Sequence, residues 1–171
     1  RPHLLLDIGG GSTELILADG RDARALTSTR VGAVRLKKDF IKTEPISFER
    51  RQFLKTFIQG SLEPAVDKVL SRISPGEVPL LVATSGTAMA IGSLVSFYDE
   101  SNPMKLQGYR ISKKKLDAVI ENLLEMSPEL RSDIPTLNSR RAEIIVPGAL
   151  ILQTAMKMLS MKELILSERA L

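Results

Sequence analysis

Asp7-Ile8-Gly9-Gly10-Gly11-Ser12-Thr13-Glu14 is the stretch that decides the fold of this 171-residue chain. The apolar residues 4–6 lead into it and the apolar residues 15–18 leave it, and both runs are typical of buried strands. Because three glycines permit a tight reversal between them, the sequence predicts a β-hairpin with a glycine-rich tip. The pair Asp19-Gly20 is a second hairpin signal, so we expect a third strand over 27–31 and an antiparallel meander.

Helical and strand patterns alternate along the rest of the chain. A short helix is expected over 34–41. A longer helical region begins at Ser47, and Gly60 and Pro64 are expected to kink it or divide it into two helices. The remaining apolar patterns predict strands over 79–83, 109–111 and 164–166. They predict helices over 88–97, from Ser112 onward and over 149–159.

This order of elements predicts one α/β domain over residues 1–171, in which a mixed sheet is flanked by helices. The sheet is expected to combine the antiparallel meander with parallel strands. Composition supports an ordinary globular domain, with 43% hydrophobic and 26% charged residues.

Composition also excludes several classes of function. The chain has no cysteine, so it has no disulfide framework, thiolate metal site or thiol nucleophile, and a cytoplasmic location is expected. No run of 18 apolar residues occurs, so we expect no membrane span. The net charge of +4 fits an anionic ligand. The basic residues lack interleaved aromatic residues, so we expect no nucleic-acid partner.

The glycine-rich tip has the composition of a phosphate-binding turn. The backbone N–H groups of Gly9, Gly10 and Gly11 can approach phosphate oxygens closely because no side chain intervenes. Ser12 and Thr13 add hydroxyl donors. A plain hairpin is the alternative, but three glycines between two acids exceed what a turn requires.

Two carboxylates flank this turn and predict a metal site. Asp7 ends one strand and Glu14 begins the next, so both can face the same phosphate group, and hard oxygen ligands beside phosphates suit Mg²⁺. A Walker-type loop is excluded because no lysine follows the glycines. A dinucleotide-binding turn is excluded because a strand, rather than a helix, follows.

Together with further segments, the hairpin resembles the exopolyphosphatase and guanosine pentaphosphate phosphohydrolase (Ppx/GppA) family, which has the actin-like ATPase, ribonuclease H-like fold. These segments follow one another along most of the chain: Val31-Gly32-Ala33-Val34-Arg35-Leu36, Ala83-Thr84-Ser85-Gly86-Thr87, residues 141–149 and residues 166–171.

The resemblance implies an enzyme of two lobes, of which this chain is the second. Such an enzyme releases terminal phosphate from polyphosphate or guanosine pentaphosphate with Mg²⁺, in a cleft between the lobes. The general base belongs to the first lobe, which is expected outside this chain, and the full-length protein could form a homodimer. By the same resemblance Asp7 and Glu14 are the catalytic and metal-binding residues, and Gly9 and Ser12 contact phosphate.

Further phosphate contacts are expected from a second glycine turn, Ser85-Gly86-Thr87, and from Arg35. Arg35 belongs to one of three basic clusters, with Lys113-Lys114-Lys115 and Arg140-Arg141, and a solvated helix face is the alternative for each.

Two other functions stay open at this level. An actin-like kinase lobe would transfer phosphate from ATP to a small acceptor. A non-catalytic sensor would bind polyphosphate or an alarmone and release no phosphate.

Overall fold

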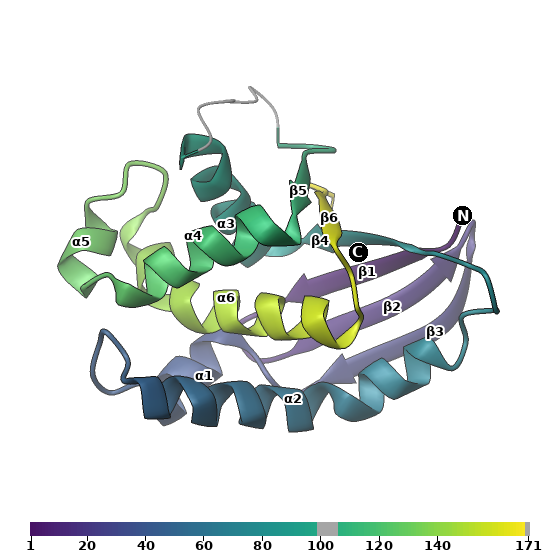
Figure 1. Cartoon of the computed structure of the whole chain (residues 1–171), viewed down its shortest axis with the longest axis horizontal. Helices are drawn as coiled ribbons and strands as arrows, with labels where there is room; N and C mark the ends of the chain where they lie inside the picture. Colours follow the sequence, from purple (N-terminus) through teal and green to yellow (C-terminus); the bar gives the residue numbers. More distant parts are fainter. Residues whose placement is uncertain (99–105, 170–171) are drawn as a thin grey trace.

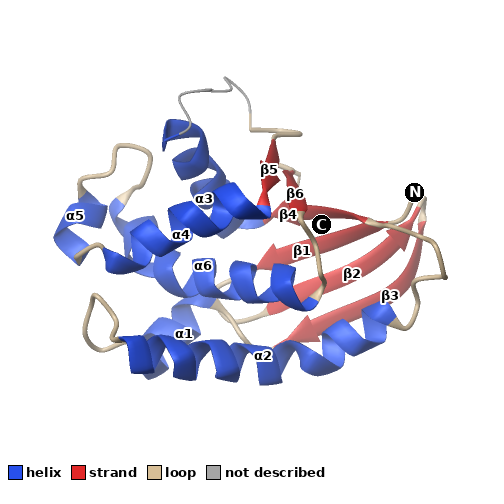
Figure 2. Ribbon diagram, viewed as in Figure 1, coloured by secondary structure: helices blue, strands red, loops and turns tan. Residues whose placement is uncertain are grey.

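A six-stranded mixed sheet forms the framework of the chain in a computed structural model, which describes residues 1–98 and 106–169 (Figures 1 and 2). The strand order is β3-β2-β1-β4-β6-β5. Strand β1 pairs antiparallel with β2 and parallel with β4, and β4 pairs parallel with β6. The predicted α/β class is therefore confirmed. The strands are β1 His3–Ile8, β2 Thr13–Asp19, β3 Asp22–Thr29, β4 Leu80–Thr84, β5 Arg110–Ser112 and β6 Glu163–Leu166.

The helices gather over one face of this sheet. Figure 1 shows α6 lying between α4 and α2, with the strands behind them. The helices are α1 Ala33–Phe40, α2 Phe48–Leu70, α3 Ser85–Tyr98, α4 Lys113–Glu125, α5 Pro128–Ser132 and α6 Ser139–Met158. None of the helices in the described part of the chain is long and apolar enough to cross a membrane.

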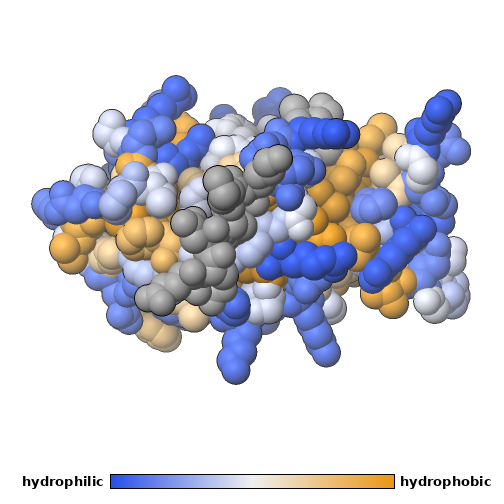
Figure 3. All heavy atoms as spheres, turned by 90° about the horizontal axis from the view of Figure 1, so that it is seen from above, coloured by the Kyte–Doolittle hydropathy of each residue, from blue (hydrophilic) through white to orange (hydrophobic). Residues whose placement is uncertain are grey.

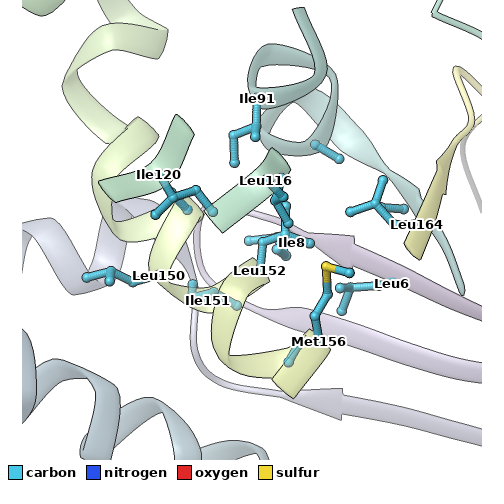
Figure 4. Packing of buried hydrophobic residues seen from close by; sticks show 14 of the residues in the cluster. Leu6, Ile8, Ile91, Leu116, Ile120, Leu150, Ile151, Leu152, Met156 and Leu164 are labelled. Atoms are coloured by element: carbon cyan, nitrogen blue, oxygen red, sulfur yellow. The ribbon is translucent and has the colours of Figure 1, made fainter. Parts of the chain in front are cut away.

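The core lies between the sheet and the helices. Alternate residues of β1 are buried, as the twofold period of a strand requires. Ile8 of β1, Leu116 of α4 and Leu152 of α6 belong to one buried hydrophobic cluster, and Figure 4 shows them close together. Seen from above, hydrophobic residues also reach the surface in a band right of centre, with hydrophilic residues around them (Figure 3).

The start of the third strand differs from the prediction. Strand β3 begins at Asp22, directly after a two-residue turn, and ends at Thr29. Gly20 has a φ of +64°, which suits such a turn. Strand β3 begins with Asp22, Ala23 and Arg24, of which the first two are exposed, so this composition gave no strand signal.

Helix α2 is one continuous helix, which excludes a division into two helices, the alternative to a kink at Gly60 and Pro64. Ser47 caps it as expected, since its side chain accepts a hydrogen bond from the amide of Arg50 at 3.1 Å. Pro64 lies inside the helix and removes one backbone donor. The helix nevertheless continues because a row of buried residues packs along its whole length: Leu54, Ile58, Leu62, Ala65, Val66 and Val69.

Helix α6 also begins earlier than predicted. It starts at Ser139 rather than near Ala149, and it runs through Pro147. The amide of Arg141 donates to the side chain of Asn138 at 2.7 Å, which caps the helix. This extension brings Arg140 and Arg141 to the end of the sheet where the glycine-rich hairpin lies.

Candidate functional site

The hairpin tip is held by the beginning of α1. The amide of Ala33 donates to the carbonyl of Gly9 at 3.0 Å, and the amide of Arg35 donates to the carbonyl of Gly10 at 3.1 Å. In a trans peptide the C=O of one residue and the N–H of the next point in opposite directions. The amides of Gly10 and Gly11 therefore point away from α1.

Three amides of the tip are free to bind an anion. The Gly9 amide donates to the Ser12 carbonyl at 2.8 Å, so it is occupied within the hairpin. Among the described residues, no acceptor pairs with the amides of Gly10, Gly11 and Ser12. The predicted phosphate-binding surface of residues 9–12 is thus limited to these three donors, and Gly9 shapes the turn that carries them.

Gly32 allows the hairpin and α1 to approach each other this closely. A Cβ atom at position 32 would overlap the carbonyl group of Gly10 and the amide of Gly11. Its φ of −148° is open to any residue, so the requirement for glycine is one of space alone. This contact gives the Val31-Gly32-Ala33 segment its structural role.

Asp7 and Glu14 lie opposite each other at the base of the hairpin, as predicted. They are paired in the β1–β2 register, which puts both side chains on one face of the sheet. The hydroxyls of Ser12 and Ser28 each donate to Oε1 of Glu14 at 2.9 Å. These two bonds hold the Glu14 carboxylate in place beside the tip.

The environment of Asp7 favours a nearby cation. Partial burial and then the charge of Glu14 raise the pKa of Asp7, while a hydrogen bond from Ser85 lowers it. Two carboxylates that repel each other form a donor set that suits Mg²⁺. The described residues contain no group of three or more acidic or histidine side chains that could hold a metal, so phosphate or water oxygens would complete such a site.

A hollow of about 190 Å³ lies beside the tip. Its lining combines the hairpin with the first turns of α1, α3 and α6, and includes Gly9, Gly10, Ser85, Gly86, Arg140 and Arg141. Neither arginine has a carboxylate within ion-pair distance in the described structure. Burial, and then the neighbouring charge of Arg140, lower the pKa of Arg141. The hollow therefore has a surplus of positive charge.

Arg141 of α6 lies directly over the start of α3. A Cβ atom at Gly86 would overlap the Arg141 guanidinium, and Nη1 of Arg141 lies 3.4 Å from Oγ1 of Thr87. Ser85-Gly86-Thr87 was predicted as a second glycine turn. The structure shows instead that it is the first turn of α3, entered through Ser85 with a φ of +93°. The sharp change of direction is made at Ser85, so no separate loop is needed.

The two predicted threonine contacts have different positions. Thr13 is 1% exposed and its hydroxyl donates to the carbonyl of Val31 at 2.7 Å, so its side chain lies in the core rather than at the tip. Thr87 is equally buried but lines the hollow, where its hydroxyl oxygen accepts a hydrogen bond from Arg141. Strand periodicity decides which face the Thr13 side chain takes.

Arg35 lies beside the site rather than in its hollow. Its amide holds Gly10, while its exposed side chain lines a neighbouring hollow with Arg30, Asp39 and Phe40. The place of Arg140 and Arg141 at the site was not predicted from the sequence, where the pair stood out only as basic. Helix α6 brings them to the hairpin because it starts at Ser139. This start was not predicted because Pro147 is a helix-breaking signal.

Comparison with known proteins gives one consistent result. A sequence profile described as the Ppx/GppA phosphatase family matches residues 1–171. Exopolyphosphatase 2 of Mycobacterium tuberculosis is 26% identical over 152 residues, which cover 89% of this chain and 46% of that protein. A guanosine-5'-triphosphate,3'-diphosphate pyrophosphatase of Vibrio parahaemolyticus is 28% identical over 169 residues, which cover 99% of this chain and 32% of that protein.

Solved structures share the fold. A Ppx/GppA enzyme of Aquifex aeolicus aligns with a TM-score of 0.85 and 24% identity over 98% of this chain and 54% of that one. An exopolyphosphatase of Cytophaga hutchinsonii aligns with a TM-score of 0.87 and 20% identity, over 98% and 53%. The chain thus spans about half the length of these solved structures. It spans less than half the length of the two curated relatives. Since the profile covers every residue, the chain belongs to the Ppx/GppA phosphatase family.

Proposed function

We propose that this chain is the second lobe of a two-lobed enzyme that hydrolyses phosphoanhydride bonds. Its substrate is a phosphate chain, either inorganic polyphosphate or guanosine pentaphosphate, from which it releases the terminal phosphate. One observation carries the proposal: the hairpin that bears three unpaired amides, at Gly10, Gly11 and Ser12, has a pair of carboxylates at its base and borders a hollow lined by two arginines without a carboxylate partner. Relatives named exopolyphosphatase and guanosine-5'-triphosphate,3'-diphosphate pyrophosphatase support it.

The backbone amides bind the oxygens of the terminal phosphate. Because α1 fixes the peptide planes of the tip, these donors need no reorganisation when charge builds up on the phosphate in the transition state. Arg141 adds a fixed positive charge from the hollow beside the tip. In phosphoryl transfer most of the rate enhancement comes from such positioning and charge stabilisation.

Asp7 and Glu14 hold Mg²⁺ in this proposal. The ion, when bound, neutralises charge on the phosphate oxygens. Ser12 and Ser28 orient the Glu14 carboxylate. The attacking water is activated by a carboxylate of the first lobe, since both acids of this hairpin serve the metal.

Replacement of Glu14 by Gln tests the assignment in the protein that carries both lobes. The substitution keeps the size of the side chain and removes its charge. We expect the release of phosphate from polyphosphate and from guanosine pentaphosphate to fall by about 100-fold or more. Glu125→Gln, an exposed position on α4, is the matched control and should leave the rate unchanged.

Each alternative predicts a different outcome of the same assay. Near-normal turnover by Glu14→Gln would contradict the assignment. Tight binding of the phosphate chain with no release by the unmodified protein would indicate a sensor. Consumption of ATP only in the presence of an acceptor would indicate a kinase.

A further inference from the structure

A second hollow of the described structure lies away from the glycine-rich hairpin. It has a volume of about 530 Å³ and is lined by residues of α2, α4 and the second half of α6: Lys55, Gln59, Lys113, Gln153, Thr154, Lys157 and Met158. Small-molecule sites usually have volumes of about 300–1,000 Å³. Arg141 and Lys157 lie at opposite ends of α6, so this hollow is separate from the candidate active site.

Three lysines from three different helices face this hollow. Lys113 is paired with Asp117 one turn further along α4. Lys55 and Lys157 have no carboxylate partner within 4.0 Å among the described residues. Asp117 also accepts a hydrogen bond from Nε2 of Gln153, at 3.0 Å. Two positive charges therefore remain without a counter-charge at the hollow.

An unsatisfied polar atom belongs to a residue that lines the same hollow. In the described part of the chain, two buried side-chain atoms have no hydrogen-bond partner, Oε1 of Gln153 and Nε of Arg51. Gln153 lines the hollow. Arg51 lies one turn before Lys55 on α2 and reaches across to Glu121 of α4 at 2.7 Å. Buried polar atoms are rarely left unpaired, so the Gln153 acceptor at the hollow awaits a partner.

We propose that this hollow is a second anion site, which binds a phosphate group carried by a molecule that also offers an O–H donor. The phosphate oxygens contact Lys55 and Lys157, and the O–H group donates to Oε1 of Gln153. Inorganic phosphate meets both requirements at neutral pH because it keeps at least one P–OH group. A small phosphorylated alcohol meets them through its hydroxyl. Sulfate carries a similar charge but has no O–H at neutral pH.

Titration of the ¹⁵N-labelled chain separates the two sites. The side-chain amide of Gln153 reports on the new site, and the backbone amides of Gly10 and Gly11 report on the hairpin. We expect inorganic phosphate or glycerol 3-phosphate to shift the Gln153 signal at concentrations about tenfold lower than sulfate requires. A response to glycerol 3-phosphate alone would identify a phosphorylated organic molecule as the ligand, and a response to inorganic phosphate would identify the free ion.

Matched double variants separate this site from general charge attraction. K55M/K157M removes the two unpaired ammonium groups and keeps most of each side chain, and it should weaken phosphate binding at Gln153 by about tenfold or more. K38M/K114M removes two exposed lysines outside the hollow and should change binding less than about twofold. Well-dispersed spectra of both variants verify folding. Absence of a Gln153 shift with either phosphate, equal binding of sulfate, or equal weakening by both variants would overturn the proposal.

Discussion

Single residues fix the geometry of the hairpin. Gly32 is required because the backbone of the tip passes where a side chain would be, whereas nothing lies within 4 Å of a Cβ atom placed at Gly11. Glycine therefore has different roles at the two positions. Gly32 permits a contact, and Gly11 leaves the amide surface open to a ligand.

Gly32→Ala should destabilise the chain for this reason. The added methyl group forces the hairpin away from α1, and overpacking of this kind costs about 1–3 kcal/mol. Urea denaturation followed by circular dichroism measures the free energy of unfolding. Gly11→Ala is the control, and a loss of stability as large as that of Gly32→Ala would contradict the assignment of the contact.

The raised pKa of Asp7 predicts a pH dependence. The folded state holds the Asp7 proton more tightly than the unfolded state, whose pKa is near 3.8. The ionised carboxylate therefore destabilises the fold, and stability relative to an uncharged side chain falls as the pH rises above 3.8.

Asp7→Asn should accordingly be more stable than the unmodified chain at pH 7, and the difference should shrink as the pH falls toward 4. Thermal unfolding at a series of pH values measures this. Mg²⁺ should reduce the difference at pH 7 by stabilising the unmodified chain. An Asn variant that is less stable at pH 7, or a difference that grows on acidification, would contradict the environment described for Asp7.

At the scale of elements, helix starts organise the site. Asn138 caps α6 just before Arg140 and Arg141, and Ser112 caps α4 far from the hairpin, where its side chain accepts from the amide of Lys115 at 3.2 Å. Loss of either cap should cost about 1 kcal/mol. Their functional consequences differ, because the first turn of α6 carries the arginines of the hollow.

Asn138→Ala should therefore weaken binding of tripolyphosphate at the hairpin, while Ser112→Ala should lose similar stability with unchanged binding. Isothermal titration calorimetry and urea denaturation of the two variants provide the comparison. Equal binding by both would show that the first turn of α6 does not position the arginines for phosphate.

The same elements show how far the sequence could predict the structure. The meander, the Ser47 and Ser112 caps and the opposed Asp7 and Glu14 follow from local patterns of turn residues, strand alternation and capping. Local patterns gave the wrong start for α6, because Pro147 is a strong helix-breaking signal and only tertiary packing of the buried helix overrides it.

The composition of the site depended on such non-local contacts. Thr13 has a suitable hydroxyl, but its place in a strand turns it inward, whereas Thr87 lines the hollow below Arg141. Arg141 reaches the tip only because α6 crosses the sheet and passes over Gly86. Sequence could supply the residue types of a phosphate site, and the arrangement of helices decides which of them take part.

On the scale of the whole molecule, one buried ion pair joins distant segments. Arg131 of α5 is 2% exposed and donates to Glu44, in the segment before α2, at 2.7 Å. It also donates to the carbonyls of Ala142 and Met126 at 3.2 and 3.3 Å. The pair thus connects α5, the first turn of α6 and the α1–α2 connection.

Removal of one partner should destabilise the molecule strongly. Arg131→Met leaves the Glu44 charge buried and uncompensated, at a cost of about 3–5 kcal/mol, and Glu44→Gln added to it should recover part of the loss. Arg110→Met, which breaks an exposed pair with Glu163, should cost no more than about 1 kcal/mol. Equal losses for the buried and exposed pairs in chemical denaturation would contradict this view of the packing.

The binding of phosphate by the three unpaired tip amides is the point on which the proposed function depends. Titration of the ¹⁵N-labelled chain with tripolyphosphate and Mg²⁺ tests it residue by residue. We predict that the amide signals of Gly10, Gly11 and Ser12 shift together in a saturable manner, while that of Gly9, already bonded to Ser12, changes least. Unchanged signals at these three amides in the presence of saturating tripolyphosphate would contradict the account.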